Sequence, residues 1–393
     1  MNLPRLLYIG DVPVEASYHG SALLYRLLQN YPAERLWVVE AGLPTSRPDR
    51  RLAGVTYINT LQPGQRWLHT RFHRWVSSAF SLNAPRRSRS VGRAVREIQL
   101  EAVLTVAHGF SWMTAAAFAR QNRLPLHYIV HDDWPRMVRA VEPVRRWVER
   151  QFKQCYREAV SRLCVSPYME GEYRRLYGAP GQVLYPSRSA DCPSYDTPPD
   201  RLTEQGRPLV FGFGGTINTG GHALALRELS AALTTIGGQL HLYGPIQSAN
   251  LEKAGLARAN VRLCGLVPAS EFIPRMRAEV DVLFVPMSFA AEDRPNMRLC
   301  FPSKLTDYTA AGLPLLIYGP EYSSAVQWAL TNDGVAEVVF MAGEQHLAKA
   351  CSALLAPDQR WKLGSKALRV GGEEFSHRRI AETFQRALTG GSP

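Results

Sequence analysis

The chain has 393 residues, of which 46% are hydrophobic and 20% are charged. This length is too great for one ordinary core, so we expect two domains, and the composition excludes a disordered or fibrous chain. The net charge of +12 favours contact with anionic partners.

Targeting and redox signals are sparse. No run of about 18 apolar residues predicts a membrane-spanning helix. The N-terminal residues 1–10 have no signal-peptide layout and read as a first strand. The cysteines are scattered and contain no C-x-x-C pair, so neither a disulfide scaffold nor a zinc site is indicated. We therefore expect a cytoplasmic protein.

In the first half of the chain, short apolar runs alternate with helical patterns. A helix is expected at 21–29, and strands at 6–9, 36–40, 102–106, 126–130, 162–165 and 183–185. Strands separated by helices predict a parallel sheet covered on both faces. Residues 60–100 are either a basic, aromatic helical excursion or a mobile loop.

Arginines gather in two N-terminal stretches. The first contains Arg66, Arg71, Arg74, Arg86, Arg87, Arg89, Arg93 and Arg96, interleaved with Trp67, Phe72, Trp75 and Phe80. The second contains Arg136, Arg139, Arg145, Arg146, Arg150, Arg157 and Arg162. Three interpretations stay open: a solvated helix face, peripheral contact with an anionic membrane, and, least favoured, a grip on nucleic acid.

A polar segment follows the first strand and opens a helix. It consists of Tyr18, His19, Gly20 and Ser21. The glycine permits close approach of a ligand, whereas the plainer interpretation is an N-cap supplied by Ser21.

His131 and Asp132 follow the strand 126–130, beyond the carboxyl end, where parallel sheets bind ligands. His131 can donate to a substrate hydroxyl or carry a proton, and Asp132 can orient it or act as a base. His127 begins the same strand, at the wrong end for that task, and is expected to be structural.

Residues 186–207 are rich in proline and polar residues, which predicts a linker. After it, helices are expected at 223–233, 270–277 and 323–331, and strands at 209–214, 239–243, 261–264, 280–286, 315–318 and 336–340. The last stretch, about 345–390, reads as helical, with breaks at Pro357 and at Gly371 and Gly372.

The strand 209–214 runs into a glycine-rich turn, Phe-Gly-Phe-Gly-Gly-Thr-Ile-Asn-Thr-Gly-Gly at 211–221. Glycines let backbone amides approach a phosphate, and Thr216 and Asn218 can add hydrogen bonds. The spacing matches neither a P-loop nor a clean G-x-G-x-x-G, so the turn alone is a weak signal.

The most informative segment is 301–319. A polar turn with Ser303 and Lys304 opens a short helix, and Asp307 lies on its first turn. Amides at a helix start and an adjacent ammonium group favour an anion, and a carboxylate one turn later can accept hydrogen bonds from a ribose diol. Together with the glycine-rich turn on the same sheet, this segment predicts a site for a nucleoside diphosphate.

The acids Glu292 and Asp293, followed by Arg294, come after the strand 280–286 and either bind sugar hydroxyls or form a solvated loop. The sequence has no G-x-S-x-G nucleophile elbow, no obvious carboxylate pair for hydrolysis and no His/Cys cluster with metal-ligand spacing.

Together these segments resemble retaining GT-B glycosyltransferases of the family-4 group, of the polysaccharide-assembly type. The resemblance spans nearly the whole chain. Residues 18–21 are similar to the family's glycine loop, 130–134 to its His-Asp strand end, 163–166 to its Val-Ser motif, and 301–314 to its Pro-Ser-Lys-Leu and Ala-Ala-Gly-Leu-Pro signature.

The resemblance implies roles for single residues. His131 corresponds to the histidine that contacts the donor sugar, and Asp307 to the ribose-binding acid, which is usually Glu. Contacts to the diphosphate are implied for Gly214, Gly215 and Thr216, with Lys304 as a further candidate, and contacts to the base for the region around Val267. From their place in the two segments, Asn218 and Ser303 are also expected to bind the donor. An acceptor site is implied at Tyr18, His19, Gly20 and Ser21.

The sequence departs from the family pattern at two places. The first of two family glutamates, eight positions before Asp307, is replaced by Leu299. The second basic residue expected after the glycine loop is missing, and His222 and Arg227 are the nearest candidates. Donor-sugar contacts are expected instead from Glu292, Asp293, Arg294 and Asn296.

The resemblance implies an α/β, GT-B fold in which two Rossmann-like domains face each other across a cleft. The N-terminal acceptor domain is expected at 1–187, joined by a C-terminal helix at about 375–390. A linker is expected at 188–207, and a nucleotide-sugar-binding domain at 208–374.

The expected function is transfer of a sugar from a nucleotide-sugar donor, with UDP or GDP, to a saccharide or lipid-linked acceptor. Retention of configuration and a role in surface polysaccharide or glycoconjugate assembly are expected. Lys304 and the glycine loop would neutralise the leaving diphosphate, so we expect neither a metal nor another cofactor. The basic stretch 66–96 would hold the acceptor at the inner face of the membrane.

Three alternatives stay open. One is a sugar-nucleotide epimerase on the same fold, and another is a nucleic-acid binder built on the arginines. The third is a non-catalytic nucleotide-sugar-binding protein, in which Leu299 marks a decayed site.

Overall fold

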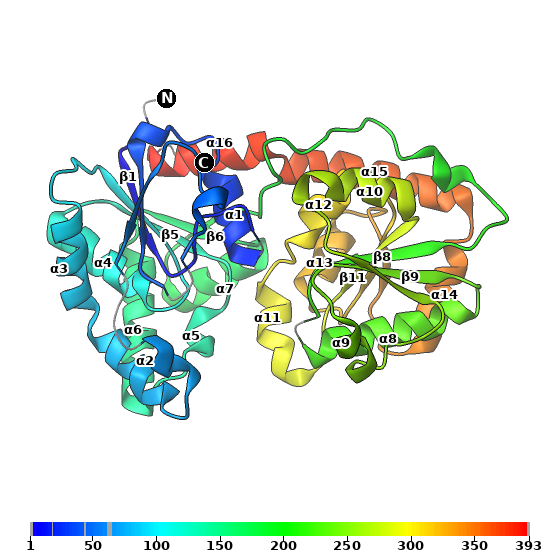
Figure 1. Ribbon diagram of the computed structural model, residues 1–393, viewed down its shortest axis with the longest axis horizontal. Coiled ribbons are helices and arrows are strands. Elements are labelled where there is room, and N and C mark those ends of the chain that lie inside the picture. The colour runs from blue at the N-terminus through cyan, green and yellow to red at the C-terminus, as the bar shows by residue number, and fades with distance from the viewer. Residues whose placement is uncertain (1–2, 18, 43–44, 61–64, 218, 391–393) are drawn as a thin grey trace. The chain divides into compact units, whose positions relative to one another are not determined.

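The computed structural model describes residues 3–17, 19–42, 45–60, 65–217 and 219–390. The chain divides into two compact units, the first formed by residues 1–190 and 377–393 and the second by residues 191–376. Each unit is a parallel β-sheet with helices on both faces (Figure 1). The predicted α/β class is therefore confirmed.

The sheet of unit 1 has seven strands in the order β3-β2-β1-β4-β5-β6-β7. The order from β3 to β6 is that of a Rossmann sheet, whose topological switch point lies between β1 and β4. Strands β1, β4 and β5 are buried along their whole length because helices cover both faces. The strand bounds are β1 Leu6–Gly10, β2 Leu36–Glu40, β3 Thr56–Asn59, β4 Ala102–Val106, β5 Leu126–Val130, β6 Ser161–Cys164 and β7 Gln182–Val183.

Alternate residues of these strands serve the two faces of the sheet. Tyr8 and Leu104 pack in one cluster with α1 (His19–Leu28) and with α16 (His377–Leu388), which contributes Ile380 and Phe384. Tyr128 points to the opposite face, where it meets Trp112 and Phe152. The helices on that side and beyond are α2 His73–Leu82, α3 Ala84–Ala94, α4 Ser111–Asn122, α5 Trp134–Met137, α6 Glu142–Glu158 and α7 Pro167–Tyr177.

The sheet of unit 2 has six strands in the order β10-β9-β8-β11-β12-β13, so the Rossmann order recurs with its switch point between β8 and β11. The strand bounds are β8 Val210–Gly214, β9 Gln239–Tyr243, β10 Val261–Gly265, β11 Val282–Pro286, β12 Leu315–Tyr318 and β13 Glu337–Val339.

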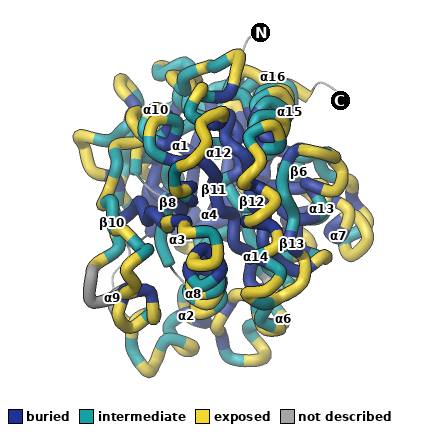
Figure 2. Tube along the Cα trace, turned by 90° about the vertical axis from the view of Figure 1, so that its right-hand side faces the viewer, coloured by how far each residue is buried: buried dark blue, intermediate teal, exposed yellow. Residues whose placement is uncertain are grey.

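Helices α8 and α14 cover one face of this sheet and share its apolar core, and α10, α12 and α15 lie on the other face (Figure 1). The bounds are α8 Gly220–Thr234, α9 Ser248–Lys253, α10 Ala269–Glu279, α11 Arg294–Leu299, α12 Lys304–Ala310, α13 Ser324–Thr331, α14 Glu344–Ala353 and α15 Pro357–Phe375. Figure 2 shows the central strands buried and the outer turns of the helices exposed.

The predicted linker residues are tied to unit 2 by a buried charge. Asp281 is fully buried and accepts hydrogen bonds from Arg201 at 3.0 Å, Arg207 at 2.7 Å and the amide of Val210 at 2.8 Å. Burial alone would raise the pKa of Asp281, but hydrogen bonds from the two arginines hold that pKa below its usual value. This ion network fixes the segment before β8 to the start of β11.

Three sequence predictions need comment. Strand β3 was not predicted because it is a short edge strand, paired only with β2, whose terminal residues are exposed. The predicted break at Gly371 and Gly372 is wrong, since α15 continues to Phe375. Packing of Phe375 against Phe301 and Trp328 outweighs the penalty of about 1 kcal/mol for each interior glycine.

The open question at residues 60–100 is resolved in favour of helices. A short 3₁₀ helix at Gln65–His69 leads into α2 and α3. Within the described part of the chain, no helix has both the length and the apolar character needed to cross a membrane.

Candidate functional site

Side chains of α12 cover the glycines at the carboxyl end of β8. Gly215 has φ of +132°, a conformation that favours glycine, and a Cβ atom there would lie 2.7 Å from Cε of Lys304. The hydroxyl of Tyr308 accepts a hydrogen bond from the amide of Gly214 at 2.7 Å. The structure thus brings the glycine-rich turn and the start of α12 into direct contact.

The ammonium group of Lys304 is desolvated. Burial lowers the pKa of Lys304 to about 8. Its Nζ lies 5.0 Å from the centre of the Phe213 ring, and no described residue supplies a carboxylate within ion-pair distance. Lys304 is partly buried, and a partly desolvated ammonium group without a carboxylate partner is well placed to receive an anion from outside the chain.

His222 joins Lys304 from the first turn of α8. Burial and, to a smaller extent, the charge of Lys304 together lower the pKa of His222 to about 4, and the charge of Asp293 opposes both effects. Its Nδ1 is buried and has no hydrogen-bond partner in the described part of the chain. Of the two candidates for the missing base, His222 lies at the site, whereas Arg227 is exposed and packs against Gly255.

The loop after β11 approaches the same place. A Cβ atom at Gly221 would lie 2.2 Å from Oγ of Ser288, so the start of α8 nearly touches this loop. Strands β8 and β11 flank the switch point of the sheet, where such folds bind ligands. We call the group formed by Gly214, Gly215, His222 and Lys304 the anion site.

The other predicted donor residues lie on neighbouring turns or outside the described residues. Ser303 directly precedes α12, and Asp307 follows Lys304 by one turn. Thr216 follows Gly215 and is partly exposed, and Val267 lies in the loop between β10 and α10. Asn218 lies outside the described residues.

The predicted donor-sugar set is divided. Asp293 is the member whose charge reaches His222. Glu292 is exposed, the Arg294 guanidinium lies 4.6 Å from the centre of the Tyr322 ring, and the carbonyl of Asn296 accepts from the amide of Cys300. Leu299 is only 2% exposed and belongs to the core, which explains in packing terms why no glutamate stands there.

In unit 1, the register of the sheet places two histidines side by side. Val106 of β4 pairs with Ile129 of β5, His108 follows β4 by two residues and His131 follows β5 by one, and the charge of His108 acts on His131. Burial lowers the pKa of His131 to about 4, Asp132 opposes this shift, and His108 adds to it. His131 is therefore neutral at pH 7 and can both donate and accept a hydrogen bond.

Trp134 lies next to His108 at this edge of the sheet. Its ring lies 4.9 Å from that of His108, and its indole N–H is buried without a hydrogen-bond partner in the described structure. Such a donor beside an aromatic face suits a polar ring such as a sugar. No sequence motif pointed to His108, and Trp134 was predicted only as the last residue of the 130–134 strand end, without a role of its own.

The other acids and histidine of this segment, Asp132, Asp133 and His127, have different surroundings. Asp132 is partly exposed beside His131, whereas Asp133 is buried and accepts from Tyr173 at 2.9 Å. His127 is buried at the start of β5, where its Nδ1 lies 2.8 Å from Oγ of Ser161. This bond gives His127 the structural role predicted for it.

The predicted acceptor segment lies beyond the end of β1. Helix α1 begins at His19, so Ser21 is its third residue and not its N-cap. A Cβ atom at Gly20 would lie 3.3 Å from Val12. Tyr18 and the side chain of His19 lie outside the described residues.

The loop after β1 also contributes a residue, Asp11, that stabilises the fold. Asp11 follows β1 and accepts from the amides of Phe110 and Ser111 at 2.5 and 2.7 Å, and so caps α4. Among the residues that the structure describes, no group of three or more His, Cys, Asp or Glu could hold a metal ion.

Comparison with known proteins agrees with this architecture. Residues 45–186 match the model of Glycosyltransferase Family 4. No curated protein matches the sequence.

Solved structures resemble the whole chain. It is similar to Alr3699/HepE of Anabaena in complex with UDP and glucose, with 14% identity and a TM-score of 0.67 over 98% of this chain and 99% of that one. It is also similar to sucrose-phosphate synthase of Thermosynechococcus elongatus, with 15% identity and a TM-score of 0.66 over 98% and 100% of the two chains. A third is WaaG, a glycosyltransferase involved in lipopolysaccharide biosynthesis, with 14% identity and a TM-score of 0.62 over 98% and 100%.

The GT-B fold, with two Rossmann-like domains, is therefore confirmed over the length of the chain. The predicted resemblance to family-4 glycosyltransferases is confirmed by the family model, which matches residues 45–186.

Proposed function

We propose that the chain is a glycosyltransferase, which moves a sugar from a nucleotide-sugar donor to a saccharide or lipid-linked acceptor with retention of configuration. Assembly of a surface polysaccharide or glycoconjugate is the proposed setting. The observation that carries the proposal is the desolvated ammonium group of Lys304, which lies against Gly215 without an anionic partner in the described structure. The similar HepE structure holds UDP and glucose, which supports a UDP-linked donor.

The anion site suits the leaving group of this reaction. When the bond between the anomeric carbon and the diphosphate breaks, negative charge builds on the diphosphate. Lys304 and the turn at Gly214, Gly215 and Thr216 would stabilise that charge, so we propose transfer without a metal. The amides of Gly214 and Gly215 donate to Tyr308 and to the carbonyl of Tyr243, so the amide proposed to meet the diphosphate is that of Thr216. Ser303 and Asn218 would add hydrogen bonds, Asp307 would hold the ribose, and Val267 would lie near the base.

Neutral His131 would bind a hydroxyl of the transferred sugar and hold it in one orientation. Asp132 would orient His131 through its charge. Further sugar contacts are proposed for Asp293, Glu292, Arg294 and Asn296. Gly20 and Ser21, with Tyr18 and His19, would line the acceptor.

An exposed aromatic surface on unit 1 supports peripheral contact with an anionic membrane. Trp75 is 68% exposed and Trp67 47%, and the Arg71 guanidinium lies 5.0 Å from the centre of the Phe72 ring. Aromatic rings next to arginines suit the interface of an anionic bilayer. Buried free thiols such as Cys155 fit a reducing compartment, so we propose a cytoplasmic location at the inner face of the membrane.

Vesicle sedimentation tests this contact. We expect binding to phosphatidylglycerol vesicles that Trp75→Ser weakens about tenfold, because one exposed indole no longer inserts. The control is Leu355→Ser, a similarly exposed apolar residue of unit 2. Equal binding by both variants and the wild type would remove the proposed surface.

The function itself is tested by a thermal-shift screen of nucleoside diphosphates, because a ligand of the folded form raises the melting temperature. The matching donor is then incubated with and without saccharide acceptors, and the anomeric configuration of the product is read by NMR. A new glycoside supports transfer, conversion of the donor alone indicates an epimerase, and binding without turnover indicates a binding protein.

A further inference from the structure

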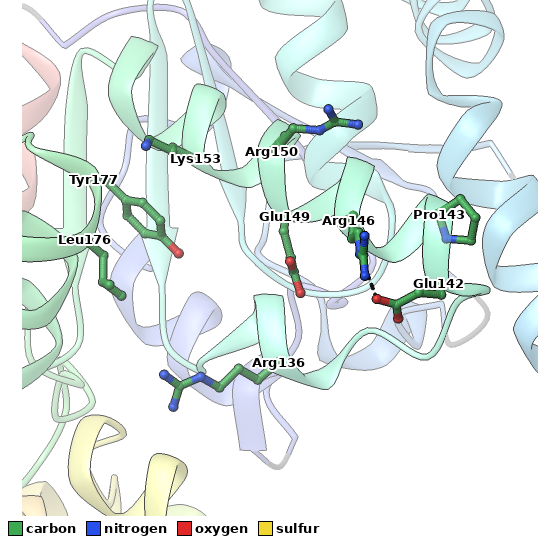
Figure 3. A pocket seen from close by; sticks show the side chains of 9 residues that line it. All are labelled: Arg136, Glu142, Pro143, Arg146, Glu149, Arg150, Lys153, Leu176 and Tyr177. Carbon is green, nitrogen blue, oxygen red and sulfur yellow. Dashed lines mark hydrogen bonds and ion pairs between the residues drawn. The ribbon is translucent and has the colours of Figure 1, made fainter.

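A groove in unit 1 runs between α6 and the carboxyl end of α7, with α5 beside it (Figure 3). Its volume is about 920 Å³. The side chains that line it are Arg136, Glu142, Pro143, Arg146, Glu149, Arg150, Lys153, Leu176 and Tyr177. We propose that this groove binds an acidic saccharide chain through its carboxylate or phosphate groups.

The acids of the groove are already neutralised. Glu142 accepts hydrogen bonds from Arg145 and Arg146, each at 2.9 Å, and these bonds lower the pKa of Glu142. Glu149 forms an ion pair with Arg145. Both carboxylates are therefore occupied by cations of the same helix, and they do not cancel the remaining positive charge.

Two basic side chains of the groove have no acidic partner among the described residues. Arg150 and Lys153 are exposed, and neither forms an ion pair or a side-chain hydrogen bond with any described residue. With Arg146 they occupy positions spaced by four and three residues, so the three lie on one face of α6. Neighbouring Cβ atoms in such a row are about 5–6 Å apart, which suits a ligand with negative groups at repeated intervals.

The opposite wall supplies a fixed polar ring. Tyr177 of α7 packs against Phe152 and Tyr173, with ring centres 5.8 and 5.1 Å away. Burial raises the pKa of Tyr177, so its hydroxyl stays protonated, and no described residue bonds to it. A phenol hydroxyl beside apolar Leu176 can bind the hydroxyls and the apolar face of a sugar ring.

These features together favour an acidic saccharide over other anions. A free phosphate would leave the aromatic wall unused, and a flat bilayer would not reach into a concave groove. The wall also contains Arg136, which pairs with Asp133 at 3.2 Å and follows His131 by five residues. The groove therefore adjoins the sheet edge of His131, and on the proposed function its ligand is the acceptor or the growing chain.

Isothermal titration of the full chain tests the groove, with a galacturonate hexamer as the probe and maltohexaose as its neutral counterpart. No donor is added, so the result does not depend on transferase activity. We expect the acidic probe to bind and the neutral one not to bind. Arg150→Gln combined with Lys153→Gln should weaken binding about tenfold, because two exposed charge-assisted contacts are lost.

The matched control is Arg258→Gln combined with Lys349→Gln, which removes the same charge from exposed positions of unit 2. Tyr177→Phe, which keeps the ring, should weaken binding about threefold through loss of one hydrogen bond. Equal weakening by the two double variants would overturn the proposal, since any surface charge would then serve.

Two other outcomes would also overturn it. Inorganic phosphate could displace the hexamer at the same concentration, which would indicate a simple anion site. Alternatively, phosphatidylglycerol vesicles could bind through Arg150 and Lys153 while the hexamer does not, which would indicate a lipid surface. A nucleoside diphosphate that still raises the melting temperature would show in either case that the donor site is intact.

Discussion

The two sheets of this protein have the same Rossmann strand order but carry different chemistry at their switch points. In unit 2, β8 ends in Gly214 and Gly215, against which the desolvated ammonium group of Lys304 lies. In unit 1, the strand ends carry His108 and the neutral His131. The difference shows that topology fixes where a ligand binds, whereas the residues after the strands fix which ligand it is.

The largest effect should come from removing the positive charge of unit 2. We expect Lys304→Ala to weaken nucleoside diphosphate binding about 100-fold, because a charge-assisted contact in a desolvated site is lost. The folded protein should not lose stability, since no described residue forms an ion pair or a hydrogen bond with this ammonium group, which is only partly buried. Titration calorimetry measures the affinity, and thermal melting of the free protein measures the stability.

The control for this variant is Lys349→Ala, an exposed lysine of α14 in the same unit. It should leave both affinity and melting temperature unchanged. If Lys304→Ala binds UDP and GDP as tightly as the control does, the anion site has no role in donor binding. The proposed division of ligand binding between the two sheets would then be wrong.

A smaller effect, in a different parameter, is expected from unit 1. His131→Ala should lower kcat about 20-fold with little change in nucleoside diphosphate affinity, because it removes hydrogen bonds to the sugar and not to the nucleotide. His127→Ala is the matched comparison, since His127 is buried with the same lowered pKa of about 4 at the other end of β5. That variant should lower stability instead, through the lost contact with Ser161. Equal kcat in the wild type and His131→Ala would contradict the assigned role.

Local sequence was enough to predict that the glycine-rich turn and the start of α12 come together, because each is a contiguous pattern, and their role in donor binding stays a prediction. Gly214, Gly215 and Lys304 each belong to a short pattern that names its own chemistry, and the parallel sheet brings the two patterns to one edge. His108 was missed for the opposite reason. It becomes a neighbour of His131 only through the pairing of β4 with β5, and that register depends on packing of the whole sheet.

The predicted donor-sugar residues show the same limit of sequence-based prediction, because adjacency in the chain does not decide which side chains reach the site. Glu292, Asp293, Arg294 and Asn296 are adjacent in sequence, yet Asp293 is the one whose charge reaches His222. Arg294 stacks on Tyr322 instead, and neither that contact nor the reach of Asp293 is visible in the sequence. The groove of Arg150 and Lys153 was equally hidden, because it depends on which acids pair with which arginines along α6.

The smallest effect concerns pH and separates the two edges without any substitution. Because the free Lys304 has a pKa of about 8, its ammonium form falls from about nine-tenths at pH 7 to about one-tenth at pH 9. An anion binds the ammonium form, so nucleoside diphosphate affinity should fall about tenfold over that range. Lys304→Arg should remove the fall, since arginine stays charged throughout. His131 and His222, whose pKa values are about 4, are neutral over the whole interval and contribute no slope. Calorimetric titrations at pH 7, 8 and 9 measure the effect, and an affinity that is flat in the wild type would mean that the bound anion does not contact Lys304.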